Sequence, residues 1–356
     1  MKKYLFAIFY FILLSGFTLF VVLDTFVLKV APETVTIPVT IKPTPTFTPA
    51  PASTSTPVAT ETQESGRGQE DREDVNVPTA TPTPTETPTP TVTITPTWTE
   101  NGYVDSNMTV TITKYREYDS DFFVVDLIIS SADILKTQLS SAYRSKSNWE
   151  VVSNISSICE NLVISINGDC WASRSGYSIK NGVVLRDTVT KYTKGFTREE
   201  PMQEDYVLFN DGTAKVIREG ETSVEKLIEQ GAWQLFNFGP VLIDDYKDVS
   251  RTSVTTSNVA AETAPRTAIG MKEDLHYVFI VVDGRSWTKA LNYMNKGVTC
   301  YELAEFGMKL GLKSLYNLDG GGSSTLYFNG EVLNKPCRNG RTIEEQTVSD
   351  IIYVGY

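Results

Sequence analysis

NLDGGGSSTLYFNG, residues 317–330, sets one aspartate against three consecutive glycines and two serines. A glycine run costs backbone entropy on folding, so it predicts a place where a side chain would block a close approach. The short segment 314–316 precedes the run, and the β-prone residues 325–328 follow it directly. The stretch therefore predicts a loop between two strands, with backbone that must come close to another group.

The chain after residue 101 carries β-like segments far more often than helical periods. The strand-like segments are 122–130, 162–167, 206–209, 233–236, 241–243, 277–282, 325–328 and 351–354. Two capping boxes predict helix starts, Thr222 with Glu225 and Thr299 with Glu302. We predict an α+β domain with a largely antiparallel β-sheet core, packed helices and polar loops at the strand ends.

The first hundred residues differ sharply in composition from the rest. Lys2 and Lys3 precede an uncharged, mostly apolar run over 4–23, which is long enough to cross a membrane and lacks a small-residue cleavage site. We predict a signal anchor and transmembrane helix over 1–30, a disordered Thr/Pro stalk over 31–100 and one domain over 101–356. A signal peptide cleaved at an atypical site is the alternative. The expected location is the cell membrane, with a single span and an extracellular domain.

The charged and sulfur-bearing residues exclude several classes of protein. A formal net charge of −11 with no basic cluster argues against nucleic acid as a partner. One histidine, His276, argues against the Ser-His-Asp and Cys-His arrangements. Outside the cell, Cys159, Cys170, Cys300 and Cys337 predict up to two disulfides, with three pairings open.

Four polar loops follow or flank the expected strands, at 163–171, at 236–245, at 264–274 followed by 277–286, and around 317–324. They hold carboxylates, two arginines and glycine amides. An arginine fork with free amides suits a phosphate, and paired carboxylates suit acid–base work or stabilisation of positive charge at a sugar anomeric carbon. Together these groups predict a substrate that contains both phosphate and sugar.

In chain order, the motifs INGD, RTAIG, VDGR, GVTCYELA, NLDGGGSST, NKP and VSD resemble those of the phosphodiester glycosidase family. The resemblance spans about residues 103–356. It implies an enzyme that hydrolyses a sugar-1-phosphodiester, with α-linked N-acetylglucosamine the typical sugar. The free sugar and a phosphomonoester would be the products, and a glycan phosphodiester of the cell surface or wall would be the substrate.

The implied chemistry gives each polar loop a role. Asp319 is the first choice for the catalytic carboxylate, with Glu302 and Asp283 as further candidates. Arg266 and Arg285 are expected to clamp phosphate or sugar. The other predicted substrate-binding residues are Asn167, Asp169, Asn317, Gly320, Gly321, Gly322, Ser323 and Ser324.

Simpler local roles compete with several of these predictions. Asp319 could cap its turn, Glu302 could serve only its capping box, and Asp283 could belong to a hairpin turn. The two arginines could form structural ion pairs, and Asn167 could pin its loop. No cofactor is expected; Ca²⁺ would suit strand-end carboxylates, but no DxDxDG loop argues for it.

Gln346 departs from the family pattern, which commonly has an arginine just before the VS pair. That departure keeps open a carbohydrate- or wall-polymer-binding module with little or no turnover. A phosphodiesterase that cleaves P–O rather than C–O is a second alternative.

Overall fold

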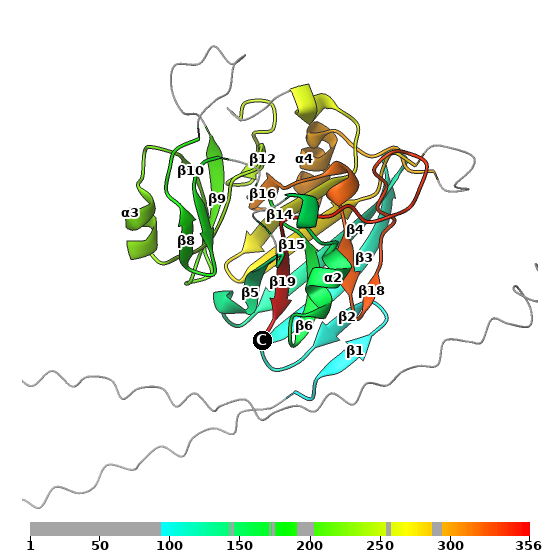
Figure 1. The fold of residues 1–356 in the computed structure, drawn as a ribbon, viewed down its shortest axis with the longest axis horizontal. Helices are drawn as coiled ribbons and strands as arrows, with labels where there is room; N and C mark the ends of the chain where they lie inside the picture. Colours follow the sequence, from blue (N-terminus) through cyan, green and yellow to red (C-terminus); the bar gives the residue numbers. More distant parts are fainter. Residues whose placement is uncertain are drawn as a thin grey trace, which may run out of the picture. The chain divides into compact units, whose positions relative to one another are not determined.

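The computed structural model describes residues 94–286 and 294–356, except 142, 144–145, 171, 173–174, 191–202 and 254–257. Its strands form three sheets, and every pair of named strands is antiparallel (Figure 1). The predicted antiparallel core is confirmed. Among the described residues, no helix is both long and apolar enough to cross a membrane. The predicted anchor and nearly all of the predicted stalk lie outside the described residues.

The largest sheet has nine strands and buries its central strands on both faces. In spatial order they are β1 (Thr97–Thr99), β2 (Gly102–Val104), β3 (Met108–Glu117), β4 (Ser120–Ile129), β15 (His276–Val282), β14 (Arg266–Glu273), β16 (Ser314–Asn317), β12 (Val241–Asp244) and β13 (Lys247–Asp248). In β15, Phe279 and Val281 face one hydrophobic cluster, while Ile280 and Val282 face the other. The second cluster is covered by α4 (Cys300–Lys309), so β15 is apolar throughout rather than alternating.

The second sheet packs on the other face of the large one. Its order is β18 (Glu331–Val332), β17 (Leu326–Phe328), β6 (Leu162–Asn167), β19 (Asp350–Gly355) and β5 (Leu135–Leu139). Ile164 and Ile352 join Phe279 in the shared core. Helix α2 (Val152–Ser157) closes the opposite side of this sheet, where Ile155 meets Ile351.

The third sheet also has five strands and carries α3 (Val224–Glu229) on one face, at the left of Figure 1. Its order is β10 (Ala214–Arg218), β9 (Glu204–Phe209), β11 (Ala232–Phe236), β7 (Ser178–Lys180) and β8 (Val183–Arg186). Short 3-10 turns complete the described elements at Ala132–Ile134, Lys146–Asn148, Asn258–Ala261 and Gly321–Ser323.

Every strand predicted from the sequence is confirmed, but three local predictions are wrong. The predicted loop 264–274 is mostly strand β14, whose polar and glycine residues hid its burial. The first capping box is displaced, because Ser223 rather than Thr222 caps α3 by accepting from the amide of Lys226. Strand β1 starts inside the predicted stalk, at Thr97.

The predicted disulfides are not formed, because no disulfide joins any of the four cysteines, all of which lie among the described residues. Cys300 lies on the buried side of α4, and Cys337 is buried with its thiol toward the carbonyl of Arg285. Both act as small apolar residues in packed positions.

Candidate functional site

Two buried strands, β6 and β16, end next to the loop over 318–325. Asn167, the last residue of β6, pairs with Ile351 of β19, and Asn317, the last residue of β16, pairs with Ala268 of β14. The loop then leaves the large sheet at β16 and enters the second sheet at β17. It is therefore a crossing between two sheets, and polar side chains from both surround it.

Asn167 fixes both ends of this crossing loop. Its side-chain amide donates to the carbonyl of Asp319 at 2.7 Å, and its amide oxygen accepts from Thr267 Oγ1 at 2.8 Å and the Thr325 amide at 3.3 Å. Asn167 is fully buried. These contacts give Asn167 the loop-pinning role that was the alternative to substrate binding.

The first two glycines of the run each make room for a particular neighbour. A Cβ at Gly320 would lie 2.8 Å from the carbonyl oxygen of Pro265. A Cβ at Gly321 would lie 2.9 Å from the guanidinium Nη1 of Arg285. The amide of Gly321 also donates to the Pro265 carbonyl at 2.9 Å, so this amide is not free to bind a ligand. The glycine run therefore packs the loop closely against Pro265, which directly precedes β14, and against Arg285.

Gly322 lies under two side chains from the C-terminal part of the chain. A Cβ there would meet Gln346 Oε1 at 2.6 Å and the Cβ of Arg338 at 2.8 Å. Gln346 also donates from Nε2 to Ser323 Oγ at 3.1 Å. The residue that departs from the family pattern is thus packed directly on the glycine loop.

A Gly321→Ala variant is expected to raise KM for substrate about tenfold by displacing the Arg285 guanidinium. The matched control is Gly330→Ala, because both glycines have positive φ, +65° and +87°, and a Cβ at Gly330 meets nothing within 4 Å. Both variants carry the backbone strain, and only Gly321→Ala adds the contact with arginine. Steady-state kinetics would contradict this interpretation if the two variants behaved alike.

A buried ion-pair network lies beside the loop. Lys180 Nζ is 3.1 Å from Asp169 Oδ2 and 3.9 Å from Asp350 Oδ2, and the three side chains are 0–3% exposed. A Cβ at Gly168 would collide with the carboxylate of Asp350. Gly168 of the INGD motif therefore leaves room for the carboxylate of Asp350, which belongs to the VSD motif. Asp169 of the same INGD motif and Asp350 both lie next to Lys180.

The pKa of Asp350 is raised to about 7, first by burial and then by the negative charge of Asp169, while Lys180 opposes the shift. The charge of Asp319 acts in the same upward direction. Asp319 itself is partly exposed. The two carboxyl groups thus differ in environment, one reachable from solvent and one buried with its proton near neutral pH.

The network continues into the third sheet through Asn237. Its backbone amide donates to Asp169 Oδ2 at 3.0 Å, and its side-chain amide donates to Glu219 Oε1 at 3.3 Å. Next to Glu219 lies Asp205, whose pKa is raised well above its usual range by burial and by the charge of Glu219. This chain of buried groups connects the third sheet to the strand ends at the site.

The two predicted arginines have different surroundings. Arg266 is buried, and it donates from Nε to the carbonyl of Val298 at 3.0 Å and from Nη2 to that of Glu262 at 2.5 Å. Arg285 is partly exposed, has φ +58° and lies against Gly321. Arg266 thus braces neighbouring loops, and Arg285 is the better-placed cation for a ligand at the glycine loop.

Asp283 ties two site loops together rather than facing outward. It is 1% exposed, and its Oδ1 accepts from Asn334 Nδ2 at 2.9 Å and from the Lys335 amide at 3.0 Å. Asn334 also donates to the Ser324 carbonyl at 2.9 Å and accepts from the Leu326 amide at 2.8 Å. These contacts favour a positioning role for Asp283.

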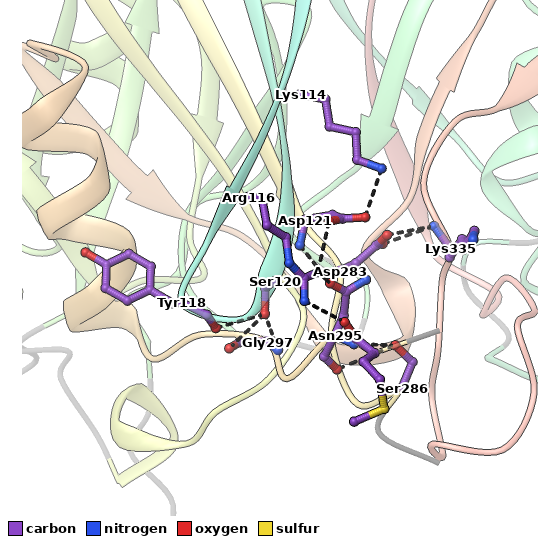
Figure 2. A network of polar contacts seen from close by, with 11 residues as sticks. Lys114, Arg116, Tyr118, Ser120, Asp121, Asp283, Ser286, Asn295, Gly297 and Lys335 are labelled. Atoms are coloured by element: carbon purple, nitrogen blue, oxygen red, sulfur yellow. Dashed lines mark hydrogen bonds and ion pairs between the residues drawn. The ribbon is translucent and has the colours of Figure 1, made fainter. Parts of the chain in front are cut away.

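Figure 2 shows how residues of β3 and β4 contact the loop that contains Asp283 and Ser286. The Asp283 amide donates to the Asp121 carbonyl at 3.0 Å, and Asn295 Oδ1 accepts from the Asp121 amide at 2.8 Å. Asn295 also exchanges backbone hydrogen bonds with Ser286. The loop that carries Arg285 is therefore held on both sides.

An Asn334→Ala variant is expected to lower the free energy of unfolding by about 2–4 kcal/mol, because three buried hydrogen bonds are lost and their partners stay buried. Urea denaturation would measure the change, with exposed Asn154→Ala expected within about 0.5 kcal/mol of wild type. Equal stability of the two variants would mean that the bridge between the loops contributes little.

The remaining predicted residues have local partners. Glu302 Oε2 accepts from the Thr299 amide at 2.8 Å, as the capping box requires. Asn317 Nδ2 donates to the Gly239 carbonyl at 2.8 Å. Ser323 and Ser324 are fully buried, and Ser324 Oγ has no hydrogen-bond partner in the described protein. The capping box accounts for the position of Glu302 without a catalytic role, which stays a prediction.

Two further findings concern titratable groups. His276 begins β15, is only partly exposed, and its Nε2 lies 3.0 Å from Asp126 Oδ1, away from the glycine loop's contacts. Within the described ranges, no group of three or more His, Cys, Asp or Glu side chains is arranged to hold a metal ion.

Sequence reasoning missed three polar residues of the site. Asp350 stood inside the VSD motif, and Asn334 inside NKP, so motif membership was the available signal. Lys180, in SIKNG, had no signal, because a lysine beside an Asn-Gly turn is typically exposed. Its burial follows from strand β7 packing beside β11, which places it 4.4 Å from the ring centroid of Phe236.

The fold and these strand-end motifs define a phosphodiester glycosidase domain, and the family's model matches residues 160–355. The chain belongs to the phosphodiester glycosidase family. It is 32% identical over 197 residues to the SPbeta prophage-derived uncharacterized protein YomE of Bacillus subtilis (strain 168), covering 54% of this chain and 28% of that protein. It is 23% identical over 202 residues to human N-acetylglucosamine-1-phosphodiester alpha-N-acetylglucosaminidase, covering 52% and 38%.

The chain therefore spans well under half the length of either relative. Among solved structures, it resembles the catalytic domain of zebrafish N-acetylglucosamine-1-phosphodiester alpha-N-acetylglucosaminidase auto-inhibited by its pro-peptide. The TM-score is 0.53 at 15% identity, with 70% of this chain and 83% of that chain covered. This likeness supports the fold.

Proposed function

We propose that the chain hydrolyses the glycosidic bond of sugar-1-phosphodiesters, with α-linked N-acetylglucosamine as the sugar. The observation that carries the proposal is the glycine loop of a phosphodiester glycosidase with a carboxylate at its start and a guanidinium against it. Asp319 precedes the loop and is partly exposed, and Arg285 lies against Gly321. The human relative's name states the same class of bond.

In this proposal Arg285 neutralises the phosphate and Asp319 stabilises positive charge at the anomeric carbon. The C–O bond breaks, water adds to the sugar carbon, and the aglycone leaves as a phosphomonoester. Such a leaving group needs little protonation near neutral pH, since its second pKa is about 6. The buried neighbour Asp350 does not contact substrate in this scheme; it acts through the electrostatic environment of Asp319.

The test is hydrolysis of an N-acetylglucosamine-1-phosphodiester by the full chain in solvent containing H₂¹⁸O. Free N-acetylglucosamine carrying ¹⁸O is the expected product. Label in the phosphate would instead establish P–O cleavage. Saturable binding without product would support a binding module.

One observation favours that binding module as a second candidate. Gln346 packs on Gly322 and Ser323 in place of the arginine expected from the family pattern. If that arginine neutralises phosphate, its absence weakens turnover while the pocket persists. A Gln346→Arg variant with higher kcat than wild type would support this reasoning.

We infer an extracellular setting from the predicted anchor and stalk, which would hold the domain in a cell-surface or wall layer rich in polymer phosphodiesters. Protease accessibility of the domain on intact cells would test this part of the proposal separately from the chemistry.

A further inference from the structure

Residues 335–341, KPCRNGR, form the most cation-dense segment next to the site. Three of the seven residues are Lys or Arg and none is acidic, in a chain whose formal net charge is −11. Polyanions are repelled by such a protein unless cations gather locally. The placement of this cationic loop, residues 335–341, therefore bears on which substrate reaches the glycine loop.

The cationic loop is built to present its charges outward. Pro336, Cys337 and Gly340 are buried, whereas Lys335, Arg338 and Arg341 are exposed. Asn339 Oδ1 accepts from the Arg341 amide at 2.9 Å and the Thr342 amide at 3.3 Å, which fixes the turn between the two arginines. The arrangement is an anchored loop with a defined tip rather than scattered surface charge.

The loop lies directly over the proposed site. The carbonyl of Arg338 accepts from Arg285 Nη1 at 3.4 Å, and the side-chain stem of Arg338 covers Gly322. At the start of the loop, the Lys335 amide donates to Asp283. One loop thus contacts both the proposed phosphate clamp and the glycine run.

Nearby acidic residues do not neutralise the two arginines of this loop. Across the described ranges, neither Arg338 nor Arg341 forms an ion pair. Glu344 accepts from Thr342 Oγ1 at 2.9 Å, and Glu345 accepts from the Ser153 amide at 3.0 Å. Two guanidiniums are left facing solvent beside a site proposed to hold one phosphate already.

We propose that Arg338 and Arg341 form a subsite for a second phosphate on the aglycone side, so that the preferred substrate is a chain of phosphodiesters. This inference rests on the proposed function of the glycine loop. A substrate with a single phosphate would use Arg285 alone, whereas a polymer with a phosphate at each unit would also engage the cationic loop. Guanidinium forks suit phosphate oxygens particularly well.

The test compares two synthetic substrates of the full chain. Both carry an N-acetylglucosamine-1-phosphodiester; one has glycerol as aglycone, and the other has glycerol phosphate dimer. Wild type is expected to show about tenfold higher kcat/KM for the dimer, and this ratio should fall toward one in Arg338→Gln/Arg341→Gln. Raising the NaCl concentration from about 50 to about 500 mM should also shrink it.

The control is Lys215→Gln/Lys226→Gln, which removes the same charge from exposed positions on the third sheet and α3. Its substrate ratio should match wild type. Equal kcat/KM for both substrates in wild type, or an equal loss in the control, would overturn the subsite. If the double variant does not fold, the ratio of kcat/KM for the two substrates is measured in Arg341→Gln alone, where it should also fall.

A separate binding measurement distinguishes failure of this inference from failure of the proposed function. Calorimetric titration with glycerol phosphate dimer alone needs no hydrolysis. Binding that weakens about threefold in Arg341→Gln supports the subsite even if neither substrate is cleaved. Hydrolysis without such binding would leave the proposed function standing and remove the subsite.

Discussion

An Asp319→Asn variant is expected to lower kcat about 100-fold or more for an N-acetylglucosamine-1-phosphodiester. Asparagine keeps the size of the side chain, so the Asn167 contact with the Asp319 carbonyl should persist. What is lost is the negative charge at the position where positive charge develops on the sugar. Removing one such electrostatic group typically costs roughly 3 kcal/mol of transition-state stabilisation.

The measurement is steady-state release of free sugar, with thermal unfolding recorded in parallel. Asp133→Asn, at an exposed position of the 132–134 turn, serves as the control for loss of one carboxylate. If Asp319→Asn kept the kcat of wild type, Asp319 would only shape its turn, and another group would have to carry the chemistry.

The strands could be predicted from the sequence because burial marks them by local composition. Residues 277–282 and 351–354 are continuous apolar runs, and both are strands in sheets covered on two sides. Strand β14 was missed because Arg266, Thr267 and Gly270 interrupt its apolar pattern. Gly270 is explained only by the neighbouring strand, whose Ser314 carbonyl would collide with a Cβ there.

In the site too, local sequence marks some features, whereas others depend on contacts between distant parts of the chain. The glycine run and Asp319 were identifiable because a backbone constraint leaves a compositional mark. The meeting of Asp169 with Lys180 and Asp350 was not, because it depends on β7 of the third sheet lying beside β6 and β19 of the second. Charges that meet through long-range topology leave no local pattern. The predicted roles of Arg266 and Asp283 in binding and catalysis stay predictions, and the structure adds the buried partners that also position both side chains.

A Lys180→Met variant is expected to lower the free energy of unfolding by about 3–5 kcal/mol at pH 8. The substitution preserves the length of the side chain and its packing near the Phe236 ring, but it removes the cation between Asp169 and Asp350. Breaking a buried ion pair on one side leaves uncompensated negative charge in a poorly solvated place, which is the costly case. Urea denaturation would measure the loss, and exposed Lys215→Met should stay within about 0.5 kcal/mol of wild type.

The pH dependence of this loss identifies its cause. The pKa of Asp350 is about 7 in the folded chain, against an ordinary value of 3.8 for an aspartate. Between these values the folded chain holds a proton that the unfolded chain has released, so the free energy of unfolding falls as pH rises through this window. Without Lys180 the folded pKa rises further, and the fall continues above pH 7. The difference between wild type and Lys180→Met should therefore be smaller at pH 5 than at pH 8. A loss independent of pH would instead indicate a packing defect, and Lys180 would be a spacer rather than the counter-ion of the buried carboxylates.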